Sequence, residues 1–178
     1  TLYAGGTFST VNGLPNKYLV AESTVDGTLQ SWNPDPNAYV LNMALSGTSL
    51  FVTGDYFQIN WPDANNFAVV DNTTGVIYLA DLDLGGGTID YAMTSGNTLY
   101  VSGSFTQVNG QSRQGLAAVD ITTGTVLPWS PTTDNLVSAI SVNGTSVYLG
   151  GNFSDVNGDS RNGLAAVDAT TGNTLSWN

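Results

Sequence analysis

The sequence contains few side chains that could do chemistry. Its 178 residues include no histidine and no cysteine, which excludes Ser-His-Asp triads, thiol nucleophiles and the usual zinc, haem and iron–sulfur ligands. Carboxylates remain, and two of them could act on a glycosidic bond. Glu22 is the single glutamate, and it replaces an apolar residue of a repeated column. A carboxylate enzyme built on Glu22 is one hypothesis, but we interpret Glu22 as a drifted strand residue and predict no enzyme activity, no catalytic residue and no cofactor.

A short segment, 155–159, has the spacing that opens a calcium loop. Oxygen-bearing side chains alternate at Asp155, Asn157 and Asp159 and could converge on a hard cation. The counterparts of this segment carry no carboxylates, and no bidentate glutamate follows it. An ordinary Asn-Gly turn is the alternative to this weak calcium candidate, so we predict no metal site.

Three Asn-X-Ser/Thr sequons make Asn72, Asn143 and Asn152 candidates for glycosylation in a secretion pathway that performs it. Chance also explains three matches in a chain so rich in Asn, Ser and Thr. The sequons are therefore compatible with an exported protein without requiring one.

Tryptophans recur at one column of the sequence, at positions 32, 129 and 177. A row of exposed indoles could stack on sugars, whereas one large aromatic per repeat could equally pack neighbouring repeats together. We predict packing for these three. Trp61 lies outside the pattern, beside Pro62, and is the better candidate for an exposed contact residue.

The charge of the chain is strongly negative, at −11, because fourteen acidic residues face only three cations, Lys17, Arg113 and Arg161. Such a field repels phosphate backbones and anionic membrane surfaces. The apolar stretches are strand-sized, well short of the ~20 residues that span a bilayer as a helix. We therefore predict no nucleic-acid partner and no membrane insertion, and we expect Arg113 and Arg161 to be solvated loop residues.

All of these residues are carried by a fourfold repeat of about 48 residues. The repeated segment begins at Leu2, Leu50, Leu99 and Val147, with offsets of 48, 49 and 48 residues. We expect a single domain with repeat units at approximately 1–37, 38–85, 86–133 and 134–178.

Each repeat contains the same predicted elements. A first strand is followed by a second apolar run, at residues 18–21, 67–70, 116–119 and 164–167. A turn that ends in glycine comes next, then a short strand that ends in tryptophan, with Ala80 in that place in the second repeat. A fourth strand, at residues 40–45, 89–94 and 137–142, leads into the following repeat. This gives fifteen strands where four full sheets need sixteen, and the missing strand would precede Thr1.

Two segments, LYVSGSFTQVNGQSRQGLAAVDITTG at 99–124 and VYLGGNFSDVNGDSRNGLAAVDATTG at 147–172, resemble the bacterial propeller repeats of the delta-60 type, kelch-like in layout. The resemblance spans essentially the whole chain, and the first two repeats depart from it at Glu22, Trp61 and Ala80. It implies an exported, often multidomain, surface protein and no defined activity.

We predict an all-β fold, a β-propeller of four four-stranded blades whose first blade lacks one strand in this chain. A linear solenoid of the same repeats is the alternative. The start at Thr1 and the Thr, Asn, Ser and Gly content lead us to expect an extracellular or cell-surface location.

An unpaired strand edge is a template for another chain. We therefore predict a non-enzymatic extracellular structural protein that self-associates through this edge, as a surface scaffold or filament subunit. The alternative function is a glycan- or protein-binding propeller module, similar to an adhesin or lectin, with glycans or cell-surface proteins as partners. A piece of a larger surface protein would fit either function.

Overall fold

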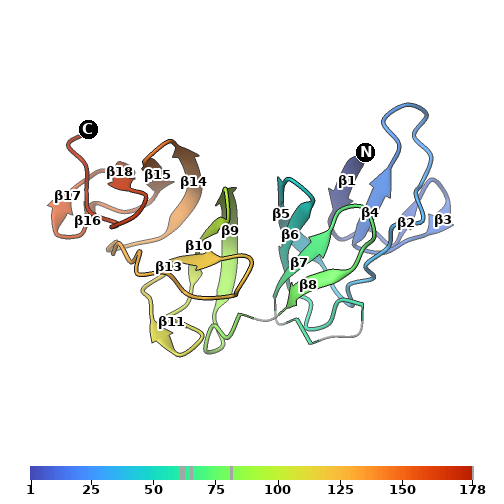
Figure 1. The fold of residues 1–178 in the computed structure, drawn as a ribbon, viewed down its shortest axis with the longest axis horizontal. Helices are drawn as coiled ribbons and strands as arrows, with labels where there is room; N and C mark the ends of the chain where they lie inside the picture. Colours follow the sequence, from blue (N-terminus) through green and yellow to red (C-terminus); the bar gives the residue numbers. More distant parts are fainter. Residues whose placement is uncertain (61–62, 65, 81, 178) are drawn as a thin grey trace. The chain divides into compact units, whose positions relative to one another are not determined.

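A computed structural model describes residues 1–60, 63–64, 66–80 and 82–177 (Figure 1). These residues are all-β and contain no helix, so none that could span a membrane; their strands form several small antiparallel sheets. The chain divides into two compact parts, Thr1–Leu82 and Asp83–Asn178, here called the amino-terminal and carboxyl-terminal halves. The division lies close to the expected boundary between the second and third repeats.

The second repeat forms a four-stranded sheet in the amino-terminal half. Its order along the sheet is β5 (Val40–Ser46), β6 (Ser49–Gly54), β7 (Phe67–Asp71) and β8 (Ile77–Ala80). Val, Ile, Phe and Tyr are frequent in these strands, as is typical of half-buried sheets. The second repeat therefore forms all four of the strands expected for one repeat in a single sheet.

The first repeat forms a smaller sheet in the same half. Its β1 (Leu2–Gly5) pairs with β4 (Leu19–Glu22), and a short hairpin of β2 (Thr10–Val11) and β3 (Leu14–Pro15) lies between them in the chain. Leu19 and Ala21 of β4 are buried with residues of β5, β6 and β7 in one apolar cluster. The two sheets of this half therefore share a core.

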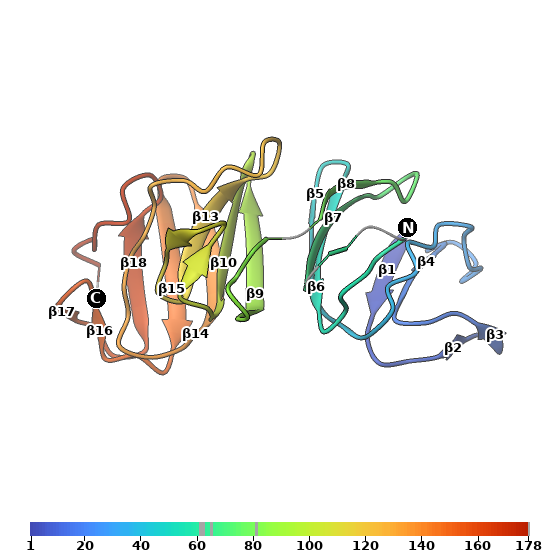
Figure 2. The ribbon, with the colours of Figure 1, turned by 90° about the horizontal axis from the view of Figure 1, so that it is seen from below.

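The carboxyl-terminal half contains the third and fourth repeats (Figure 2). Their sheets have the orders β13-β10-β9 and β14-β15-β18. The strands are β9 (Thr88–Ser95), β10 (Thr98–Ser104), β13 (Leu116–Asp120), β14 (Val137–Asn143), β15 (Ser146–Gly151) and β18 (Leu164–Asp168). Two short hairpins complete the half: β11 (Gln107–Val108) with β12 (Gln111–Ser112), and β16 (Asp155–Val156) with β17 (Asp159–Ser160). A single buried cluster joins both sheets and includes Tyr100, Trp129 and Leu149.

The predicted tryptophan strand forms only where its tryptophan is absent. In the second repeat the ladder continues to Ala80, which pairs with Ala68. In the other three repeats the strand is reduced to one bridge, to Leu29, Val126 or Thr174. Trp32 and Trp129 instead turn to the neighbouring repeat and donate hydrogen bonds there. The prediction of four strands per sheet is therefore wrong for these repeats in the residues described, and a contact between repeats replaces the ladder.

The predicted turns are confirmed. Gly27, Gly75, Gly124 and Gly172 close their turns with φ between 70° and 75°, a conformation that glycine adopts without steric cost. Asn-Gly pairs with positive φ at both residues join the strands of the three short hairpins, as type I′ turns require.

Candidate functional site: an open strand edge

The edge of β1 is the first candidate. Gly6 donates its N–H to Tyr18 O at 2.9 Å, so the alternation of an antiparallel ladder directs Ala4 and Leu2 towards β4. The backbone groups of Tyr3 and Gly5 then face away from β4. Among the described residues no strand pairs with that side, whereas β6, β10 and β15 each lie between two strands.

A glycine at the same position of every repeat indicates where a strand paired with β1 would lie. A Cβ atom added to Gly54, Gly103 or Gly151 would lie 2.0–2.1 Å from a carbonyl oxygen at or just before the first residue of the strand that enters its sheet, that of Tyr39, Thr88 or Leu136. Only glycine leaves room for that carbonyl. Gly6 occupies the same column, but its nearest neighbour is the Phe8 ring at 3.4 Å. The first repeat therefore has an open space where the others hold a strand.

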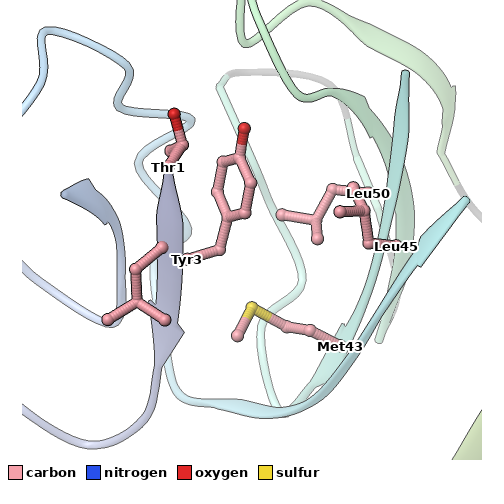
Figure 3. A pocket seen from close by; sticks show the side chains of 6 residues that line it. Thr1, Tyr3, Met43, Leu45 and Leu50 are labelled. Carbon is pink, nitrogen blue, oxygen red and sulfur yellow. The ribbon is translucent and has the colours of Figure 1, made fainter. Parts of the chain in front are cut away.

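A pocket of about 280 Å³ lies beside this edge, between β1 and β5 (Figure 3). Tyr3, Met43 and Leu50 point into it, and Thr1, Leu2 and Leu45 complete its lining. In the carboxyl-terminal half the corresponding region receives a side chain from β9, because Met93 lies opposite Tyr100 and packs against the core. Tyr100 is the counterpart of Tyr3, so the pocket lies where a completing strand would place its own side chain.

A second recurring feature joins successive repeats. Tyr3 and Trp32 form an edge-to-face pair with ring centroids 5.0 Å apart, and Tyr100 and Trp129 form the same pair at 5.0 Å. We call each pair a tyrosine–tryptophan clamp. The hydroxyl of Tyr3 donates to Asn72 O at 2.5 Å and the indole of Trp32 to Asp71 O at 2.9 Å.

The second clamp makes the same contacts. Tyr100 donates to Ala169 O at 2.9 Å and Trp129 to Asp168 O at 3.0 Å. Both clamps therefore hold the Asp-X-Thr-Thr-Gly turn of the following repeat. Burial raises the pKa of the Tyr3 and Tyr100 hydroxyls above the ordinary tyrosine value, at which the hydroxyl is already a protonated donor at neutral pH. Trp32 and Trp129 are core residues, as predicted, and are only 5% and 1% exposed.

The aspartates that open these turns are structural. The amides of the two following threonines donate to Oδ1 of Asp71, Asp120 and Asp168. For Asp71, the Tyr78 hydroxyl and the Thr74 amide lower the carboxyl pKa well below its usual range. The Thr123 and Thr171 amides lower the pKa of Asp120 and Asp168 in the same way. Low pKa values suit anionic hydrogen-bond acceptors and do not suit a proton donor at neutral pH.

The calcium candidates lie at the β16–β17 hairpin. Asp155 Oδ1 accepts the Gly158 N–H at 2.7 Å, and Asn157 Oδ1 accepts the Thr132 N–H at 2.9 Å. Asn157 also donates to Gly172 O at 2.9 Å, so its side chain ties the hairpin to two other segments. Asp159 is exposed in β17. In the described part of the chain, no three acidic side chains gather as a metal site would require.

The sequon asparagines have different surroundings. Asn143 ends β14 and Asn152 follows β15, and both are exposed. Asn72 is half-buried, and its Nδ2 donates to Gly47 O at 2.9 Å. Trp61, the predicted contact residue, lies outside the described residues. Glu22 lies at the end of β4, half-buried and opposite Leu2.

The expectation of solvated arginines is wrong for Arg113. This residue is buried, and its guanidinium donates to Leu127 O at 2.6 Å and Ser112 O at 2.7 Å. Arg161 is partly buried and makes the equivalent contacts with Leu175 O and Ser160 O. Each arginine thus holds the end of a short hairpin against a segment fourteen residues further along the chain. The recurrence of arginine at one position of the repeat could have indicated this structural role.

Comparison with known proteins gives structural likeness only. No protein-family model and no curated protein matches the chain. The crystal structure of the computationally designed Ika4 protein is similar with a TM-score of 0.60 and 12% identity, over 84% of this chain and 78% of that one. The computationally designed Ika8 protein is similar with a TM-score of 0.54 and 16% identity, over 88% of this chain and 44% of that one. At such identities the likeness concerns the fold alone.

Proposed function

We propose that the chain is a non-enzymatic structural module, a scaffold or filament subunit that associates by adding a strand to the open edge of β1. The observation that supports this most directly is the edge itself, which no strand pairs among the described residues. Unpaired backbone donors and acceptors are a template for an additional strand, and the neighbouring pocket would accept one of its apolar side chains.

We propose further that the four repeats are blades of a β-propeller. The regular 48- or 49-residue spacing, one main antiparallel sheet per repeat, and the clamps from the first and third repeats to the repeats that follow them support this arrangement. This chain matches only 44% of the Ika8 chain, which is compatible with an assembly that contains more than four repeats.

A structural role agrees with the chemistry of the side chains. The chain has no histidine or cysteine, and the lowered pKa values belong to aspartates that accept hydrogen bonds in turns. An extracellular or surface location is part of the proposal, supported by the low lysine content and by exposed sequons at Asn143 and Asn152. Glu22→Gln would leave every property of such a protein unchanged, and a hydrolytic activity lost in that variant would overturn the non-enzymatic part.

The Gly6→Ala variant tests strand addition. The new methyl group meets only the Phe8 ring, at ordinary contact distance, so the variant should fold with unchanged stability. A strand added to β1 would bring its carbonyl to about 2 Å from that methyl, as Tyr39 O lies 2.0 Å from the Cβ position of Gly54. Sedimentation velocity over a concentration series should show association of the wild-type chain and a monomer for Gly6→Ala.

Gly103→Ala is the matched control. Its methyl group would clash with Thr88 O, which is already present, so this variant should lose about 1–3 kcal/mol of stability in urea unfolding. A wild-type chain that remains monomeric at high concentration, or a Gly6→Ala variant that associates as well as wild type, would overturn strand addition at β1.

A further inference from the structure

The fourth repeat presents a third clamp. The rings of Tyr148 and Trp177 lie 5.4 Å apart with an interplanar angle of 85°, as in the two clamps already described. Within the described residues, neither the Tyr148 hydroxyl nor the Trp177 indole has a hydrogen-bond acceptor. Trp177 is 46% exposed, whereas its counterparts Trp32 and Trp129 are 5% and 1% exposed. The third clamp is formed, but its two donors are unused.

The occupied clamps specify what the third one should bind. Each tryptophan donates to a carbonyl 39 residues further along, and each tyrosine to a carbonyl 69 residues further along. Both carbonyls belong to the turn of the following repeat. The turn's own glycine N–H also donates to the first of them, for example Gly172 to Asp168 O at 2.9 Å, so this oxygen uses both lone pairs. The ligand of a clamp is thus the backbone of one turn type.

Among the described residues, two such turns have carbonyls that no clamp holds, Ser23–Gly27 and Asp120–Gly124, and the first of them lies in the repeat whose β1 edge is open. In the first repeat, Gly27 donates to Ser23 O and Ser23 donates to Thr28 O, both at 2.9 Å, as the corresponding residues do in the other turns. Ser23 O and Thr24 O correspond to Asp71 O and Asn72 O. Val25, at the tip, is 94% exposed.

We propose that Tyr148 and Trp177 clamp the Ser23–Gly27 turn of a second copy of this chain, with Tyr148 donating to Thr24 O and Trp177 to Ser23 O. A second copy is the occupant because its first repeat carries both the free turn and the open β1 edge. In the carboxyl-terminal half, β14 follows Trp129 along the chain and pairs with β15 of the repeat that Trp129 clamps. Within that half, the strand and the clamp therefore come from the same neighbouring repeat, and in the first repeat the open β1 edge and the free turn occupy the two corresponding positions. This surface differs from the one in the proposed function, although both serve association of copies.

The second repeat suggests the variant that tests the clamp. It carries Phe51 and Ala80 where the other repeats carry tyrosine and tryptophan, so it has neither donor. The double variant Tyr148→Phe/Trp177→Ala gives the fourth repeat these same two residues. We expect self-association at least about tenfold weaker by sedimentation velocity, as for loss of a central aromatic anchor, with thermal unfolding little changed. Phe57→Ala, which removes another exposed aromatic side chain, should associate like wild type.

Cross-linking identifies the occupant. Thr1 and Thr73 line one pocket in the amino-terminal half, and their counterparts at the proposed contact are Ser146 and Val25. The chain has no native cysteine, so Ser146→Cys and Val25→Cys provide unique thiols. A short bismaleimide should join a mixture of the two single variants into a cross-linked dimer.

Three other outcomes would overturn the proposal. A doubly substituted chain that cross-links within a monomer, while the mixture gives no dimer, would assign the clamp to the chain's own first repeat. No cross-link in either sample would show that the clamp binds no such turn. Association that survives Tyr148→Phe/Trp177→Ala but is lost in Gly6→Ala would leave strand addition standing without the clamp, and the reverse result would leave the clamp standing alone.

Discussion

Replacing Trp129 by phenylalanine should destabilise the carboxyl-terminal half by about 2–3 kcal/mol. Trp129 is 1% exposed, and its indole donates to Asp168 O at 3.0 Å. Loss of that hydrogen bond costs about 1 kcal/mol net, because Asp168 O keeps its bond from the Gly172 N–H and is not left unpaired. The smaller ring adds about 1–2 kcal/mol for the space it leaves in the core and for the altered contact with Tyr100.

The assay is urea unfolding of the full chain, combined with hydrogen exchange measured by mass spectrometry on separate peptides. Exchange should accelerate for peptides covering β13 and β18 and remain unchanged for β4 and β7. Trp177→Phe is the control, since a half-exposed side chain whose indole has no acceptor among the described residues should change monomer stability by less than about 0.5 kcal/mol. Equal losses in the two variants, or no loss in Trp129→Phe, would refute the role of the clamp in holding successive repeats together.

Three further predictions concern the turns and surface residues. Hydrogen bonds lower the pKa of the folded Asp168 carboxyl below its unfolded value of about 3.9, so the carboxylate's contribution to stability is present above that value and is lost as the pH falls towards the lowered pKa. The fall in Tm between pH 5 and pH 2 should therefore be shallower in Asp168→Asn. An unchanged slope would contradict this. Millimolar calcium should not raise the Tm, since Asp155 and Asn157 use their oxygens in the hairpin, and a calcium-dependent rise that is lost in Asp155→Asn would restore the metal site. In a eukaryotic secretory host, mass spectrometry should find glycans at Asn143 and Asn152 and none at Asn72, whose Nδ2 is bound to Gly47 O; a glycan at Asn72 would show that this bond does not protect it.

The sequence predicted what local chemistry determines. The glycines with positive φ, the aspartates that accept turn amides, and the start of each first strand follow from residue type and spacing alone. It did not predict that the tryptophan strand would shrink to single bridges, because Trp32 and Trp129 leave the ladder for an acceptor 39 residues away.

The clamp and the buried arginine were missed for a related reason. A tyrosine recurs at one position of the repeat, at Tyr3, Tyr100 and Tyr148, as regularly as the tryptophans do. A tyrosine in a strand is common, however, and the partner of its hydroxyl lies in another repeat. Arg113 was expected in solvent because it lies in no basic patch and beside no phosphate-binding loop, whereas its partners are backbone carbonyls. Contacts between repeats join residues that are far apart in the sequence, so neighbouring residues do not reveal them. Only a residue type that recurs at the same position of the repeat could have indicated them.

The first repeat has an unpaired β1 edge and the fourth repeat has a clamp without an acceptor among the described residues, and this predicts the result of mixing two variants. Tyr148→Phe/Trp177→Ala disables only the donor end, and Gly6→Ala disables only the strand edge at the receiving end. A contact between unlike surfaces repeats indefinitely unless it closes into a ring. If strand addition and clamping act together, each variant alone should be monomeric, while a mixture still has one intact pair of ends. The mixture should therefore form a dimer of one chain of each variant and stop there. Multi-angle light scattering on mixtures with one variant carrying a mass tag would measure this. Larger species in the mixture, or dimers of a single variant, would show that the chains associate through some surface other than these two ends.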